Sequence, residues 1–137
     1  DVNGLICPIM DARRKQVYMG IYRYEDHRLM TVKDQMAVGI EELLSMLNEM
    51  GEAVTFLGDG VPVFKDIIAD KLTVPFSFAP AHLSRQRAGA VGALGVLYYK
   101  EGRTETAAEH KPDYLRVSQA ERERAQKLKK VSEGENA

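Results

Sequence analysis

The sequence has one cysteine, no long apolar run and no large excess of either charge. Cys7 is the only cysteine in 137 residues, so the chain forms no internal disulfide, and its apolar neighbours predict a buried, unreactive thiol. Without a disulfide framework, the cytoplasm is the expected compartment. The lack of an apolar segment long enough to span a bilayer predicts no membrane insertion. The net charge of -1 excludes a uniformly basic nucleic-acid binder but allows a local basic patch.

Residues 5–24 have the pattern of two strands joined by a charged turn. Residues 5–10 are almost wholly apolar, as in a strand covered on both faces, and Asp11 stands where this strand ends. Residues 13–16 are polar and form the turn. From Val17 to Tyr24, apolar side chains alternate with others, which is typical of a pleated strand.

Residues 28–51 predict a third strand followed by a helix. Residues 28–33 are the expected strand, and Asp34 is the expected N-cap of the helix. Apolar residues then recur at helical spacing from Met36 to Met50, and Gly51 is typical of a helix end.

Residues 53–78 predict a strand, a helix and a further extended segment. Residues 53–57 are the strand, and Pro62 suits the first turn of a helix that continues to Leu72. Residues 73–78 are extended, and Pro75 predicts that they lie at a sheet edge or enter the sheet late.

The remainder of the chain predicts two more helices and a tail. Ser84 is the expected cap of a helix ending near Lys100, whose many small residues predict close packing on the sheet or on another helix. Residues 118–131 form a thinly apolar surface helix that begins with a capping box at Ser118, and residues 132–137 are expected to be disordered.

This order of elements predicts one α/β fold. Three strands joined by short turns suit an antiparallel meander, and the later alternation suits parallel strands with crossover helices. The expected result is a mixed sheet of about five strands flanked by helices. That order resembles the ribonuclease-H-like unit, which also forms each half of actin-like (ASKHA) proteins.

Asp11 is the first candidate for a chemical role. It could cap the turn, contact a partner or act in catalysis. A metal-dependent nuclease would need several carboxylates to converge, and Asp11, Asp34 and Asp59 are the acids near strand ends or helix starts. A phosphate-binding turn of the actin-like type would need glycines after Asp11, and the turn has none.

Gly58, Asp59 and Gly60 form a loop between a strand and a helix, where backbone N–H groups can bind anions. The loop lacks the lysine of a nucleotide-binding P-loop, so it indicates either tight-turn geometry or a vestigial nucleotide loop.

The remaining polar residues form no recognisable catalytic group. The three histidines share no metal-ligand spacing, so no zinc site and no cofactor are expected. Ser84 is better explained as a cap than as a nucleophile. The basic side chains could line a surface that touches RNA phosphates or a solvated face of mixed charge; they are Arg85, Arg87, Arg103, Arg116, Arg122 and Arg124.

Four segments resemble a known family, the TsaB (YeaZ) proteins. They are MDARRKQVYMGIY, FLGDGV, QRAGAVGALG and PDYLRVSQAERE, in the order and spacing of the C-terminal half of that family. The resemblance implies that residues 1–117 are the C-terminal actin-like domain and that the N-terminal actin-like half lies outside this sequence.

The resemblance also implies a function. TsaB-type proteins support TsaD, the catalytic subunit, in placing threonylcarbamoyladenosine on tRNA beside the anticodon, with TsaE as ATPase. The chain would then be a non-catalytic scaffold that meets tRNA through the complex and could form a homodimer. Asp11, Arg13 and Arg14 are the expected functional surface. The alternatives are an actin-like ATPase or phosphotransferase using Asp11 and residues 58–60, and a glycoprotease-like peptidase.

Overall fold

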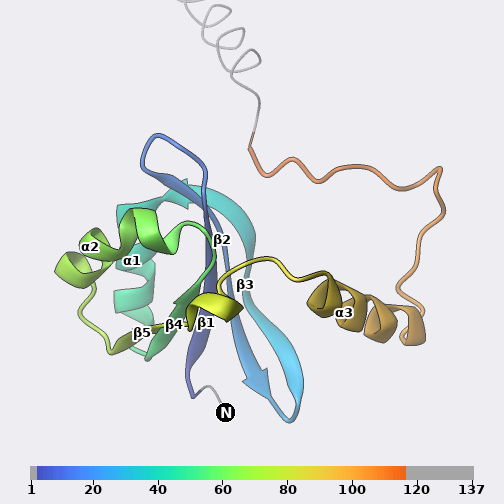
Figure 1. The fold of residues 1–137 in the computed structure, drawn as a ribbon, viewed down its shortest axis with the longest axis horizontal. Coiled ribbons are helices and arrows are strands. Elements are labelled where there is room, and N and C mark those ends of the chain that lie inside the picture. Colours follow the sequence, from blue (N-terminus) through green and yellow to red (C-terminus); the bar gives the residue numbers. More distant parts are fainter. Residues whose placement is uncertain (1–2, 117–137) are drawn as a thin grey trace, which may run out of the picture.

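The computed structural model describes residues 3–116, which form one mixed sheet and three α-helices (Figure 1). The elements in chain order are β1 (Leu5–Asp11), β2 (Gln16–Glu25), β3 (Arg28–Gly39), α1 (Ile40–Met50), β4 (Val54–Leu57), α2 (Val61–Lys71), β5 (Phe76–Phe78), the 3-10 turn η1 (Ala81–Leu83) and α3 (Ala88–Lys100).

The sheet has the order β3-β2-β1-β4-β5. Strands β1, β2 and β3 pair antiparallel, whereas β4 is parallel to both β1 and β5. Pairs such as Ile9 with Met19 and Cys7 with Phe56 set the register around the central strand β1. The predicted fold class, a mixed five-stranded α/β sheet, is confirmed. The predicted edge position of the segment containing Pro75 is confirmed by β5.

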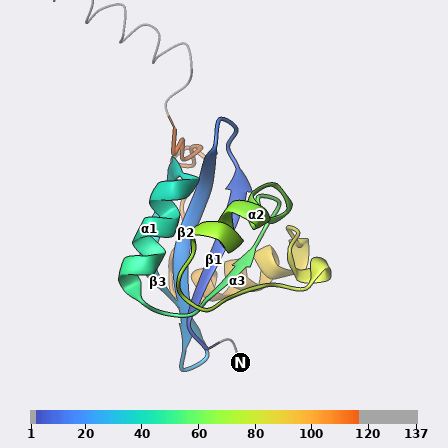
Figure 2. The same ribbon diagram turned by 90° about the vertical axis from the view of Figure 1, so that its left-hand side faces the viewer.

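The core lies between one face of the sheet and the helices α1 and α2. Figure 2 shows both helices in front of the sheet and α3 behind it. The buried core residues from the strands include Leu5, Cys7, Ile9, Val17, Met19, Ile21, Val54 and Phe56, and those from the helices are Ile40, Leu43, Leu44, Leu47, Phe64 and Ile68. Burying one apolar face of each element is what holds such a sheet and its helices together.

The third strand continues further than the sequence pattern predicts. Strand β3 runs to Gly39, and α1 begins only at Ile40, so the predicted helix start and the N-cap role of Asp34 are wrong. Met36 and Val38 pair with β2 instead. The ladder of strand hydrogen bonds outweighs the local capping signal of Asp34. The predicted end is confirmed, because Gly51 adopts a left-handed conformation (φ 70°) and donates its N–H to the Leu47 carbonyl.

Helix α3 departs furthest from its predicted packing. It begins at Ala88, with Arg87 rather than Ser84 at the N-cap, so the predicted cap is wrong. A Cβ atom placed on Gly89, Gly92 or Gly95 would meet nothing within 4 Å. Close packing of these small residues on the sheet, one of the two predicted arrangements, is therefore wrong, whereas packing on a helix outside the described residues stays a prediction.

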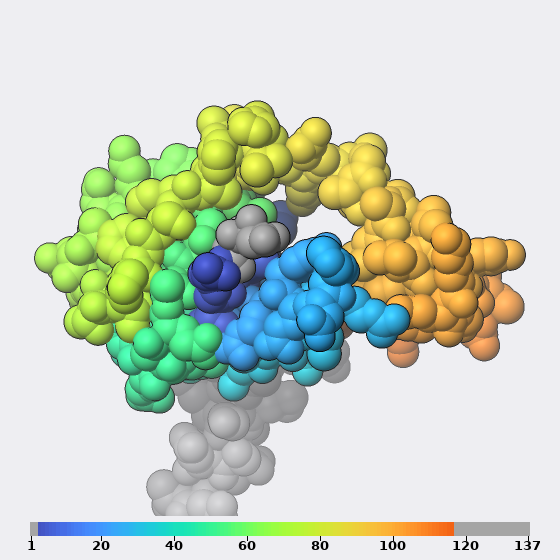
Figure 3. Space-filling model, turned by 90° about the horizontal axis from the view of Figure 1, so that it is seen from below, coloured from blue at the N-terminus to red at the C-terminus, as the bar shows by residue number. Residues whose placement is uncertain are grey.

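Tyr98 is the one half-buried residue of α3, and every other residue of this helix is exposed. Burial, and to a smaller extent Tyr98, raises the pKa of Tyr22 on β2. Figure 3 shows an open space between the β2–β3 strands, in blue, and the segment carrying α3, in orange. The sheet face opposite α1 and α2 is thus covered only at its margin.

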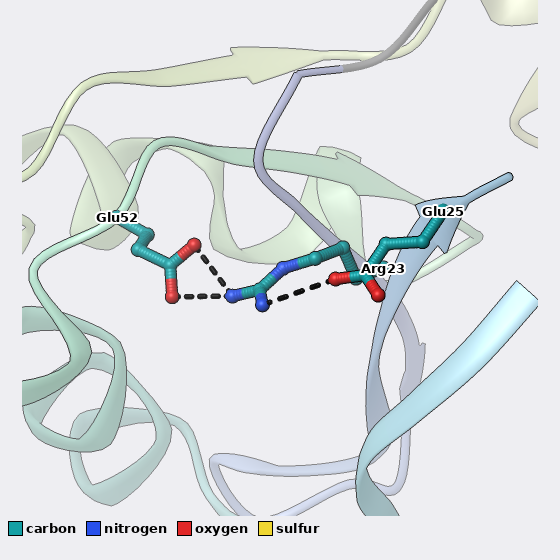
Figure 4. Close-up of polar contacts among 3 residues, drawn as sticks. All are labelled: Arg23, Glu25 and Glu52. Carbon is teal, nitrogen blue, oxygen red and sulfur yellow. Dashed lines mark hydrogen bonds and ion pairs between the residues drawn. The ribbon is translucent and has the colours of Figure 1, made fainter.

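An ion pair joins β2 to the loop before β4 at the end of the sheet where β1 begins. Arg23 Nη2 donates to both carboxylate oxygens of Glu52, at 2.5 and 2.6 Å, while Nη1 lies 3.4 Å from Glu25 Oε1 (Figure 4). The Arg23 side chain is one-third exposed, so water screens the pair and its contribution to stability is modest.

The predicted helix over residues 118–131 and the predicted tail over 132–137 lie outside the described residues. Within residues 3–116, no helix is long and apolar enough to cross a membrane.

Candidate functional site

The carboxyl end of β1 and the loop after β4 meet at one end of the sheet. Because β1 and β4 are parallel neighbours, their carboxyl ends emerge together, which is where open α/β sheets place their sites. Asp59 Oδ1 accepts a hydrogen bond from the Asp11 N–H at 3.3 Å. Two sequence-predicted groups, 48 residues apart, therefore lie side by side.

Asp11 also organises the turn that follows it. Its Oδ1 accepts the Arg13 N–H at 2.8 Å, and its Oδ2 lies 3.9 Å from Arg13 Nη1. A short acid bonded to the backbone two residues further on is a standard turn former. This geometry supports the turn-capping interpretation of Asp11.

The glycines of the loop 58–60 allow it to lie against β1. Gly58 has φ of 105°, and a Cβ there would lie 2.2 Å from the Ile9 carbonyl oxygen. A Cβ on Gly60 would lie 3.0 Å from the same oxygen, which accepts the Gly60 N–H. Any larger side chain at either position would push the loop away from β1.

The first turn of α2 has its N–H groups already in use. Val61 donates to the Gly58 carbonyl and Val63 to the Gly60 carbonyl, and Pro62 has no N–H. A phosphate cradle needs several free N–H groups pointing at the ligand. The geometry therefore favours a tight structural turn over a nucleotide loop for residues 58–60.

Two adjoining hollows open beside this loop, with volumes of about 560 and 500 Å³. Both are lined by Gly58, Asp59, Ser84 and Arg85. The larger one is walled mainly by apolar residues, among them Pro8, Met10, Leu57 and Leu83. The Ser84 hydroxyl donates to the Ala79 carbonyl at 3.2 Å, so this side chain closes a local turn. Arg85 thus reaches the same end of the sheet as Asp11 and Asp59.

Arg116 lies against the turn from a distant part of the chain. Its Nη1 donates to the Ala12 carbonyl at 2.7 Å and to Gln16 Oε1 at 3.1 Å, with the guanidinium partly buried. The sequence grouped Arg116 with the arginines of a contact surface. In the structure Arg116 is half-buried against the turn, whereas Arg13 and Arg14 are exposed, and its place in a contact surface stays a prediction.

Arg87 is exposed at the N-cap of α3.

Two residues of the turn between β1 and β2, Lys15 and Gln16, are not among the site residues that the sequence predicts. The sequence predicts Gln16 only as a turn residue, because its hydrogen bond with Arg116, 100 positions away, leaves no pattern in the local sequence. Lys15 could have been included, because it follows Arg13 and Arg14 directly.

The titratable side chains of residues 3–116 do not gather into a metal site. No three or more of His, Cys, Asp and Glu lie close enough there to hold a metal ion. His110 pairs with Glu105 at 2.5 Å, while His27 lies in the β2–β3 turn and His82 in η1. Burial raises the pKa of Cys7 from 9.0 to about 12, which keeps this thiol protonated.

Comparison with known proteins shows what the chain is similar to. The chain is 36% identical over 119 residues to the tRNA threonylcarbamoyladenosine biosynthesis protein TsaB of Bacillus subtilis, covering 87% of this chain and 50% of TsaB. No family model matches the chain.

Two solved structures from Pseudomonas aeruginosa share the fold. A protein described as similar to the peptidase YeaZ has a TM-score of 0.60 at 17% identity, covering 83% of this chain and 50% of its own. YeaZ itself has a TM-score of 0.59 at 16% identity, covering 82% and 50%. The chain thus spans about half the length of the proteins that it matches. The resemblance to half of a TsaB (YeaZ) protein, predicted from the sequence, is confirmed.

Proposed function

We propose that the chain is a non-catalytic component in the formation of threonylcarbamoyladenosine on tRNA. The observation that carries this proposal is the 36% identity to TsaB over 119 residues. A TsaD-type protein would perform the transfer and a TsaE-type protein would act as ATPase. Work on tRNA would place the chain in the cytoplasm. Self-association through the small residues of α3 stays a prediction.

The geometry of the described residues favours a role as a scaffold for a catalytic partner. The carboxylates of Asp11 and Asp59 accept backbone N–H groups, and the Ser84 hydroxyl donates to a carbonyl. These side chains form local structure rather than a nucleophile and its base. A scaffold needs a shaped surface and no reacting group.

The modified nucleoside itself provides the test. Bacillus subtilis cells lacking TsaB would express this chain alone, or with the half of TsaB that it does not match. Mass spectrometry of hydrolysed tRNA would measure threonylcarbamoyladenosine. We expect modification to return when both halves are present. No modification with both halves folded and expressed would contradict the proposal.

Calorimetric titration separates the scaffold from the ATPase alternative. The purified chain would be titrated with ATP-magnesium and, separately, with TsaD. We expect no heat from ATP, because the N–H groups of the α2 first turn are in use. Micromolar ATP binding, lost in Gly58→Ala, would instead support the actin-like phosphotransferase.

A further inference from the structure

The turn between β1 and β2 has an unusual backbone. Arg13, Arg14 and Lys15 have φ angles of 64°, 55° and 57°, so three consecutive non-glycine residues lie in the left-handed region. Side chains with a Cβ are disfavoured there, and such a turn persists only when surrounding contacts hold it. The turn is therefore a fixed shape rather than a loose loop.

Backbone hydrogen bonds hold both ends of this turn. Ala12 N–H donates to the Gln16 carbonyl at 2.9 Å, and Gln16 N–H donates to the Arg13 carbonyl at 3.0 Å. The Lys15 carbonyl accepts the N–H of Ile40, the first residue of α1, at 3.0 Å. The turn is thereby tied to the start of a core helix.

Arg116 adds a side-chain brace from the other end of the chain. One nitrogen, Nη1, contacts both the Ala12 carbonyl and the Gln16 amide oxygen. These contacts cross the base of the turn, where Ala12 and Gln16 lie on either side of the exposed cations. Arg116 is therefore a positioning residue, half-buried against the turn.

The turn presents three adjacent cations to solvent. Arg13, Arg14 and Lys15 are all exposed, and the Arg13 side chain is 87% exposed. Two acids lie near these cations: Asp11, at 3.9 Å from one nitrogen of Arg13, and Glu41, which interacts electrostatically with Lys15. In a chain with net charge -1, this is a concentrated positive surface.

Phosphate is the ligand chemistry that fits this surface. Arginine forks and lysine ammonium groups contact phosphate oxygens, and such contacts position a nucleic acid without reading its sequence. A rigid turn loses little conformational freedom on binding, since its backbone is already ordered. As the ligand of this surface, RNA is favoured over an acidic protein surface, because the molecule modified in the proposed function is a tRNA.

We propose that the turn Arg13–Lys15, braced by Arg116, binds the phosphate backbone of RNA. This inference rests on the proposed role in tRNA modification and names the part of the chain that touches the RNA. It assigns contact to Arg13, Arg14 and Lys15, and positioning to Arg116 and Gln16.

The contact is tested by measuring the affinity of the full chain for unmodified tRNA over a range of salt concentrations. Arg13→Gln with Lys15→Gln removes two charges from the turn. Arg28→Gln with Lys100→Gln removes two exposed charges elsewhere and is the matched control. We expect the turn variant to lose at least about tenfold in affinity at 0.1 M salt and to flatten the salt slope by about two, while the control changes little.

Three results would overturn this assignment. They are no binding of tRNA by the unaltered chain, equal losses in the two double variants, or a turn variant that loses binding to TsaD while keeping its affinity for tRNA. Because the assay contains no modifying enzyme, its failure is distinct from failure of the proposed function, which is measured as threonylcarbamoyladenosine content.

The brace is tested with a neutral substitution. Gln16→Ala removes one acceptor of Arg116 and leaves the net charge unchanged, whereas Gln35→Ala removes a hydrogen bond to Asp113 and serves as the matched control. We expect Gln16→Ala to weaken tRNA binding several-fold with the salt slope preserved, because all three cations remain. Equal affinities for Gln16→Ala and Gln35→Ala, with both variants folded by circular dichroism, would overturn the positioning role.

Discussion

His27 occupies a backbone conformation that suits glycine better. Asp26 and His27 form the two-residue loop between the paired residues Glu25 and Arg28, with φ angles of 47° and 62°. Positive φ at both positions defines a hairpin turn in which glycine is preferred at the second. We expect His27→Gly to raise the free energy of unfolding by about 1 kcal/mol, measured by urea denaturation.

A glycine in a strand provides the comparison. Thr31→Gly, within β3, should instead lower the free energy of unfolding by about 0.5–1 kcal/mol. If His27→Gly were destabilising as well, the His27 side chain would have to supply contacts that outweigh the backbone strain.

Cys7 is the residue whose chemistry depends most on burial. Its side chain is fully buried on β1, and its pKa is raised to about 12. Alkylating reagents attack the thiolate, so we expect native protein at pH 8 to react very slowly and protein unfolded in urea to react readily. Rapid reaction of the native protein would show that β1 opens at its core position.

The same shift predicts how stability depends on pH. The pKa of Cys7 in the folded protein lies above its ordinary value of 9.0. The contribution of the buried thiol to the free energy of unfolding is therefore complete below about pH 9 and is lost as the pH rises toward 12. We expect the difference in unfolding free energy between the native sequence and Cys7→Ala to shrink over that interval.

At the scale of elements, helix α1 carries much of the core. Leu44 is 1% exposed, and Leu44→Ala should lower the free energy of unfolding by about 2–5 kcal/mol by leaving a cavity. Val63 on α2 is 57% exposed, so Val63→Ala should change the free energy of unfolding by less than about 0.5 kcal/mol. Guanidinium titrations would measure both variants. Similar losses of unfolding free energy for Leu44→Ala and Val63→Ala would contradict the placement of Leu44 in the core and of Val63 on the surface.

The elements also show where sequence reasoning succeeds. Gly51 and Pro62 act through their own backbone geometry, so the end of α1 and the start of α2 were predictable. Asp34 offered an equally clear capping signal, but pairing between β2 and β3 decided the outcome. A local signal is reliable when the backbone itself enforces it, and unreliable when a neighbouring strand competes.

At the scale of the molecule, the directions of the strands followed from connection lengths, whereas the strand order and the composition of the site did not. Short turns imply antiparallel neighbours, and helical crossovers imply parallel ones. The meeting of Asp11 with Asp59 follows from that order, because both stand at carboxyl ends of parallel neighbours. The contact of Arg116 with Gln16 depends on the return path of residues 103–116, which carries no periodic pattern.

Helix α3 allows a test of how the whole molecule is assembled. Val91 and Val96 are 70% and 53% exposed, and no residue of α3 is buried. The double substitution Val91→Gln with Val96→Gln should therefore change the free energy of unfolding by less than about 0.5 kcal/mol and leave the melting temperature nearly unchanged. Leu43→Gln on α1, which is fully buried, is the control and should prevent stable folding. If the α3 variant were strongly destabilised, the helix would have to pack against the sheet in solution, and the open face of β2 would be part of the core.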